Sequence, residues 1–94
     1  MHPLIEQHRA DILALAEQYG IENVRVFGSM ARGDAGDTSD VDLLVFLPKG
    51  QSALALGGLL MDVQDLLKRS VDVVSERGLH PMLRENILKE AVPL

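Results

Sequence analysis

Four aspartates fall within nine residues of this 94-residue chain, at Asp34, Asp37, Asp40 and Asp42. The last two are separated by one residue and lead into an apolar run, Val41 to Leu47. If that run is a strand, alternation places both carboxylates on the same face, with Cα atoms about 6.6 Å apart. Two carboxylates that close repel each other unless a cation lies between them. An all-oxygen pair at this spacing suits Mg²⁺, which takes one or two carboxylates and completes its shell with phosphate oxygens and water.

A further carboxylate, Asp72, interrupts a second apolar run, Val71 to Val74. If this run is a strand beside the first, Asp72 supplies a third ligand to the same cleft. Taken alone, a position at a strand edge explains Asp72 equally well. A lone aspartate in a loop is usually a cap or a solvated turn residue. This structural explanation fits the pair Asp40 and Asp42 less well, because the two carboxylates lie together at an apolar strand.

Gly28 and Ser29 directly follow a short run of β-branched and aromatic residues, Val24 to Phe27. Glycine lets a phosphate approach the backbone closely, and the serine hydroxyl and the exposed N–H groups beyond it can bind phosphate oxygens. A Gly-Ser pair after a strand is a weak signal by itself. It gains weight here because the intervening loop can fold it against the aspartate pair.

Arg32 is the only cation in residues 26–48, and two roles are open to it. It either faces phosphates or neutralises the aspartates around it. Other catalytic classes receive no support from the sequence. It has no cysteine and no P-loop pattern, and the three histidines, which we expect to have surface or packing roles, show no metal-ligand spacing.

The elements that must position these residues alternate between helix and strand patterns. The spacing of apolar residues predicts helices over Leu4–Tyr19, Ala53–Lys68 and Pro81–Ala91, strands over Val24–Phe27, Val41–Leu47 and Val71–Val74, and a turn or short helix over Ser29–Ala35. This order indicates an α/β (α+β) fold, in which helices pack on a small three-stranded mixed sheet. The last helix is expected to bury Leu83, Ile87, Leu88 and Ala91. With no linker or repeat, residues 1–94 are expected to form one domain.

Composition limits the classes of partner. Hydrophobic residues make up 47% of the chain and charged residues 24%, which is typical of a globular protein. A net charge of −5 argues against electrostatic attraction to nucleic acid or to an anionic membrane, and 3% aromatic residues argue against a base-stacking surface. A bound nucleotide whose charge is neutralised by metal stays compatible with this composition. No apolar stretch approaches the roughly 18 residues of a membrane span. We therefore expect a soluble, cytoplasmic protein.

Two motifs carry a resemblance to a known family. The segments GSMARGDA at 28–35 and SDVDLLV at 39–45 closely resemble the signature of the minimal nucleotidyltransferases (MNT proteins), which belong to the DNA polymerase beta-like superfamily. The resemblance continues through Ala53–Lys68, Val71–Val74 and the segment Leu83–Ala91, and thus covers most of the chain. It implies the nucleotidyltransferase fold and a role for each candidate residue.

In that family, MNT proteins are commonly antitoxins paired with HEPN-domain RNase toxins. The resemblance implies transfer of AMP from ATP to a tyrosine hydroxyl of the toxin. Asp40 and Asp42 would hold two Mg²⁺ ions, as in the two-metal logic of polymerases. Asp72 would ligate one of them and help to activate the hydroxyl, while Gly28 and Ser29 would bind the β- and γ-phosphates.

A partner is also favoured by the size of the chain, which has no second lobe to bind an acceptor. Leu54, Met61 and the pair Gly57-Gly58 give the predicted helix over Ala53–Lys68 more apolar surface than one core-facing stripe needs, although a wide buried face explains this equally well. Two other functions stay open. One is an antitoxin that acts by binding alone, and the other is a nucleotidyltransferase for a small molecule or RNA with a separate substrate-binding subunit. The net charge weakens the RNA alternative.

Overall fold

The computed structural model describes residues 1–36 and 38–94, so that Asp37 lies outside the described residues. The order of elements is α1 (Pro3–Gln18), β1 (Glu22–Phe27), α2 (Ser29–Arg32), β2 (Val41–Phe46), α3 (Leu54–Leu67), β3 (Val71–Ser75), a single 3₁₀ turn η1 (Glu76–Gly78), α4 (Pro81–Glu90) and β4 (Val92–Pro93). Every helix and strand predicted from the sequence is present, with ends that differ by at most two residues. The segment predicted as a turn or short helix contains α2.

The strands form one mixed sheet in the order β3-β2-β1-β4. β2 and β3 are parallel, as expected for strands joined by a crossover helix, whereas β1 is antiparallel to both β2 and β4. The predicted mixed sheet is confirmed, but the predicted number of strands is too small. The additional strand, β4, is only two residues long and ends in proline. Two residues are too few to give a recognisable strand pattern in the sequence.

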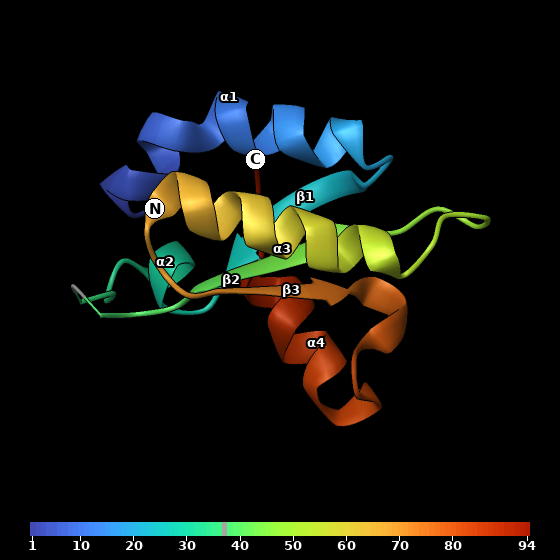
Figure 1. Ribbon diagram of the computed structural model, residues 1–94. Helices are drawn as coiled ribbons and strands as arrows, with labels where there is room; N and C mark the ends of the chain where they lie inside the picture. Colours follow the sequence, from blue (N-terminus) through green and yellow to red (C-terminus); the bar gives the residue numbers. More distant parts are fainter. Residues whose placement is uncertain (37) are drawn as a thin grey trace.

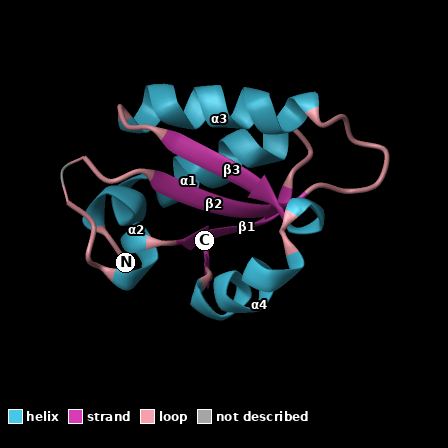
Figure 2. Cartoon of the chain, turned by 90° about the horizontal axis from the view of Figure 1, so that it is seen from below, coloured by secondary structure: helices cyan, strands magenta, loops and turns pink. Residues whose placement is uncertain are grey.

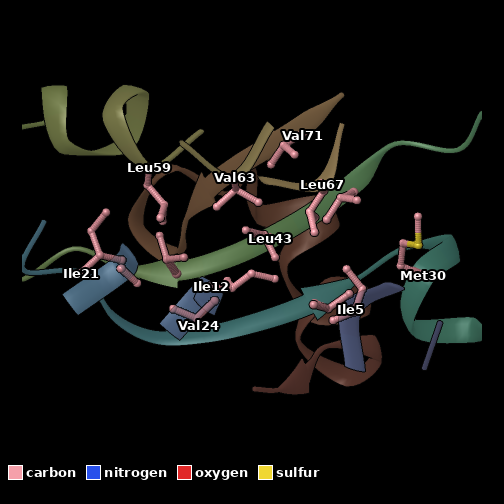
Figure 3. Close-up of a cluster of buried hydrophobic side chains, with 14 residues drawn as sticks. Ile5, Ile12, Ile21, Val24, Met30, Leu43, Leu59, Val63, Leu67 and Val71 are labelled. Atoms are coloured by element: carbon pink, nitrogen blue, oxygen red, sulfur yellow. The ribbon is translucent and has the colours of Figure 1, made fainter. Parts of the chain in front are cut away.

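The main core lies on one face of the sheet, beneath α1 and α3 (Figures 1 and 3). Alternate residues of β2 point into it, and Val41, Leu43 and Val45 are all fully buried. They meet Ile5 and Ile12 of α1 together with the buried positions of α3, which are Leu59, Val63 and Leu67. The other face of the sheet carries Asp42 and the fully buried Leu44, which alternate with these core residues along β2.

A close approach between α1 and α3 depends on a glycine. A Cβ at Gly58 would overlap the ring of Tyr19, the residue that ends α1. The Tyr19 hydroxyl donates a hydrogen bond of 2.6 Å to Asp62, which raises the pKa of that tyrosine. Gly58 is therefore a packing residue, whereas a Cβ at Gly57 would meet open space.

α4 lies on the opposite side of the sheet from α1 and α3 (Figure 1). Seen from that side, it lies on the β1 side of the sheet and leaves β2 and β3 in view (Figure 2). The prediction that α4 buries one face is wrong for two of its residues, because Leu83 is 56% and Leu88 37% exposed. Ile87 and Ala91 are half-buried. The physical reason is the connection to β4, whose pairing with β1 holds the end of α4 at the edge of the sheet.

Two of the histidines have structural roles. His2 and His80 are the N-caps of α1 and α4, and their Nδ1 atoms accept hydrogen bonds from the backbone N–H groups of Leu4 and Met82. A proline follows each cap in the first turn of its helix. Among the helices formed by residues 1–36 and 38–94, none combines the length and apolar character needed to cross a membrane.

Candidate active site

Asp42 and Asp72 are direct partners in the parallel register of β2 and β3. Neighbouring strands lie about 4.8 Å apart, so that the two carboxylates project side by side from the sheet. They point to the face opposite the main core, because the residues on either side of Asp42, Val41 and Leu43, are buried within that core. The structure thus places Asp72 beside Asp42, and it does so on β3, the edge strand of the sheet, so that both positions left open by the sequence are combined. A role of Asp72 as a ligand stays a prediction.

Gly28 brings the turn after β1 against the same carboxylate. Phe27, the last residue of β1, pairs with Asp42, and Gly28 then adopts φ 72° and ψ −155°, a conformation that is essentially restricted to glycine. A Cβ at this position would overlap Oδ2 of Asp42. Glycine is therefore required by both the backbone conformation and the close approach of the carboxylate.

The turn continues into the single helical turn α2, which Ser29 opens. The carbonyl oxygen of Gly28 accepts hydrogen bonds from the N–H groups of Ala31 and Arg32, both at 3.1 Å. The N–H groups at the start of a helical turn have no partner inside it. Ser29 directly follows Gly28, the residue that lies against the Asp42 carboxylate, and its hydroxyl and N–H are donors of the kind that bind phosphate oxygens.

Asp40 precedes β2, as expected from a strand that begins at Val41. It lies one residue before β2 and is exposed, so that strand alternation does not by itself fix its side chain. Its charge nevertheless acts on the site. The pKa of Asp42 is raised, first by partial burial and then by the negative charges of Asp72, Asp40 and Glu90. The site has an excess of negative charge that a cation would relieve.

This donor set fits a divalent metal ion that the protein holds jointly with a nucleotide. No three acidic or histidine side chains among residues 1–36 and 38–94 are arranged to hold a metal ion by themselves. Mg²⁺ does not require such a group, since it usually binds one or two carboxylates and takes further oxygens from phosphates and water. The adjacent carboxylates of Asp42 and Asp72, and the raised pKa of Asp42, are consistent with that mode of binding.

Arg32 is paired in the structure with two carboxylates. Its Nε donates to Asp34 at 3.1 Å, and its Nη1 donates to Glu90 at the end of α4. It therefore neutralises neighbouring acids, one of the two roles left open by the sequence, and its charge partly opposes the causes that raise the pKa of Asp42. Glu90 was missed in the sequence, because a single glutamate at the end of a helical pattern carries no signal of its own.

The exposed apolar residues fall on two sides of the molecule. Leu54 and Met61 are 84% and 57% exposed on α3, which covers the sheet face away from Asp42. Met82, 81% exposed, lies with Leu83 on α4, on the same side of the sheet as the acidic residues. Partner contacts by Leu54 and Met61 stay a prediction.

Comparison with known proteins points to one family. The model of the nucleotidyltransferase domain matches residues 9–94. Two curated relatives are "Putative protein adenylyltransferase MJ0435" of Methanocaldococcus jannaschii, 35% identical over 94% of this chain and 95% of that protein, and "Protein adenylyltransferase MntA" of Thermococcus cleftensis, 36% identical over 83% and 79%.

Solved structures agree with this assignment. The chain is 46% identical to a "putative minimal nucleotidyltransferase", with a TM-score of 0.87 and coverage of 100% of this chain and 97% of that one. It also shares the fold of an MNT antitoxin solved in complex with a tri-AMPylated HEPN toxin of Shewanella oneidensis. There the TM-score is 0.72 and the identity 18%, over 94% of this chain and 69% of that one.

Proposed function

The chain belongs to the nucleotidyltransferase domain family, in its minimal form, and from this premise we propose that it is an antitoxin that transfers AMP from ATP to a tyrosine hydroxyl of a HEPN toxin. Protein adenylyltransfer is the activity named for both curated relatives, which the chain matches over most of its length. A HEPN toxin as the target is supported by the toxin–antitoxin complex that shares its fold.

One observation carries the proposal: the Gly28-Ser29 turn lies against the carboxylate of Asp42, which in turn lies beside Asp72. A turn suited to phosphate binding and a carboxylate pair thus lie together at one end of the strands β1, β2 and β3. A triphosphate held at Ser29 has its α-phosphorus near the two carboxylates. Figure 2 shows no helix in front of β2 and β3 on the face that carries them, and Asp72 is exposed, so that an acceptor can approach this carboxylate from solvent.

The transfer is an in-line displacement at phosphorus. The tyrosine oxygen, held about 3–3.5 Å from the α-phosphorus, forms the new P–O bond, and the bond from that phosphorus to the bridging oxygen of the β-phosphate breaks. Pyrophosphate leaves, and the phenol proton passes to the carboxylate of Asp72. Ser29 and the backbone N–H groups of the turn hold the β- and γ-phosphates, and so keep the leaving group in line.

Asp40, Asp42 and Asp72 are the residues that would hold Mg²⁺, which when bound neutralises the phosphate charge and favours departure of pyrophosphate. Without a cation these carboxylates repel an incoming triphosphate. The chain itself contributes mainly position and charge.

The partner supplies the acceptor and the surface that the chain lacks. Met82 and Leu83 lie at the start of α4, on the same side of the sheet as the site, and are 81% and 56% exposed, which gives a toxin an apolar surface to contact. The opposite end of α4, at Glu90, is the one that reaches the acidic residues. Once formed, the tyrosyl phosphodiester adds charge and bulk that persist after the two proteins separate. Neutralisation can therefore be catalytic.

A titration separates catalytic neutralisation from inhibition by binding. A fixed amount of the cognate HEPN toxin is incubated with increasing amounts of the protein, in ATP and Mg²⁺, and its RNase activity is then measured. We expect substoichiometric protein to silence the toxin. Asp40→Ala should fail to do so, while Glu85→Gln, an exposed substitution on α4, should act like the wild type.

The opposite result supports the binding alternative. If RNase activity falls only as the ratio reaches one to one, and Asp40→Ala neutralises equally well, the protein inhibits its partner by contact and the enzymatic proposal fails.

A further inference from the structure

Arg32 is held in place by two carboxylates that come from distant parts of the chain. Asp34 lies two residues further along, whereas Glu90 is the last residue of α4. The Glu90 side chain is only 28% exposed, against 52% for Arg32. The ion pair with Glu90 therefore joins the turn after β1 to the end of α4 at the rim of the acidic site.

The position of Glu90 is fixed by the strand that follows it. Val92 and Pro93 pair with Val26 and Arg25 of β1, and the N–H of Leu94 donates to the carbonyl of Val24 at 2.9 Å. β1 runs directly into the Gly28-Ser29 turn. The contact between Arg32 and Glu90 therefore links α2 to the end of α4, while β4 links the same end of α4 to β1.

The two carboxylates engage two of the three guanidinium nitrogens of Arg32. Arginine has five N–H donors in one plane, and Arg32 uses Nε for Asp34 and Nη1 for Glu90. Within residues 1–36 and 38–94, no acceptor is bonded to Nη2. With both edges fixed, the plane of the guanidinium is set before any ligand binds. Planar, oriented donors are those that recognise phosphate oxygens best.

We propose that Glu90 is a positioning residue for the nucleotide: together with Asp34 it orients Arg32, so that the free N–H groups of the guanidinium bind a phosphate of ATP held at Gly28 and Ser29. This inference rests on the proposed function. Arg32 is at the end of the same helical turn that Ser29 opens, and its charge reaches the Asp42 carboxylate. Arg32 then both neutralises nearby carboxylates and faces a phosphate, which are the two roles that the sequence left open.

The alternative is that the Arg32–Glu90 pair only joins α4 to the rest of the fold. The two explanations differ in what a double mutant does. If Glu90 acts through Arg32, its removal has no further effect on ATP binding once Arg32 is gone. If the pair is only structural, the loss of Glu90 alters thermal stability and leaves the affinity for ATP unchanged.

The test measures the Kd of Mg²⁺–ATP by calorimetry, without any partner protein, for the wild type, Glu90→Gln, Arg32→Gln and the double variant. The matched control is Glu85→Gln, which removes an exposed ion pair with Lys89 on the same helix. Thermal unfolding of each variant is recorded alongside. Because no acceptor is present, the result does not depend on the identity of the partner.

We expect Glu90→Gln to weaken Mg²⁺–ATP binding about three- to tenfold, and Arg32→Gln by at least as much. The double variant should match Arg32→Gln within about twofold, and Glu85→Gln should match the wild type. An unchanged Kd for Glu90→Gln, or an equal further loss in the Arg32→Gln background, overturns the inference. A toxin that is never adenylylated refutes the proposed function, yet leaves these binding results standing.

Discussion

Substitution of Gly28 by alanine should separate the cost to the fold from the cost to the active site. Two effects act at this position. The backbone at φ 72° and ψ −155° is strained for any residue with a Cβ. The Cβ would also overlap Oδ2 of Asp42, so that this carboxylate has to move away from the turn and out of its present position beside Asp72.

The magnitude follows from these two effects. A non-glycine residue in this region of backbone conformation costs about 1–3 kcal/mol. For a domain of about 100 residues each kcal/mol lowers Tm by about 4–8 °C, which gives a decrease of roughly 10 °C for a middle value of about 2 kcal/mol. Displacement of a positioned catalytic group by about 1 Å can lower the rate by about 10²-fold.

The assay compares Gly28→Ala with Gly50→Ala. Gly50 also has a positive φ, 94°, but a Cβ there meets no atom within 4 Å. Gly50→Ala therefore bears the backbone strain alone. We expect both variants to lose stability in thermal unfolding, and only Gly28→Ala to lose adenylyl transfer. Transfer by Gly28→Ala at a rate within about threefold of the wild type would refute the reasoning, because a group displaced by about 1 Å should cost far more.

Three other predictions follow from the site and the core. The pKa of Asp42 is raised above 3.8 in the folded state, so its ionised form opposes folding when no cation is bound. Asp42→Asn should therefore abolish transfer yet raise the urea midpoint of unfolding at neutral pH. This gain in the midpoint should shrink as the pH falls through the raised pKa and vanish below pH 3.8. A lower midpoint at neutral pH would show that Asp42 has a structural role. Calorimetry should show tight binding of ATP in Mg²⁺ and a large loss of affinity in EDTA, and equal affinities would argue against a metal site. Gly57→Ala should stabilise α3 by about 0.5–1 kcal/mol in urea denaturation, whereas Gly58→Ala should give no such gain because its Cβ displaces the Tyr19 ring; equal gains would contradict this packing.

The parts of the fold that the sequence predicts are those set by strong local patterns. The runs that become β2 and β3 are continuous and apolar, and each contains one aspartate, so that the parallel pairing of the strands brings Asp42 and Asp72 together. The turn at Gly28 is equally predictable, since a glycine directly after a strand indicates a special backbone conformation.

The rest depends on tertiary contacts that no local pattern reveals. β4 is a strand only because β1 offers it an edge, and this pairing also draws α4 away from the position in which Leu83 and Leu88 would be buried. Glu90 acquires a role through Arg32, 58 residues earlier in the chain. Asp40 looks equivalent to Asp42 in the motif, yet it precedes the strand by one residue.

The most direct test of the central claim follows the two ends of the ATP triphosphate. The HEPN toxin is incubated with the protein, Mg²⁺ and ATP labelled either at the α-phosphate or at the γ-phosphate, with Asp42→Asn as the inactive control. We predict that the α-label becomes covalently attached to a tyrosine of the toxin and that the γ-label is released in pyrophosphate. A toxin that gains the γ-label, gains neither label, or is labelled equally by Asp42→Asn would contradict adenylyl transfer at this site.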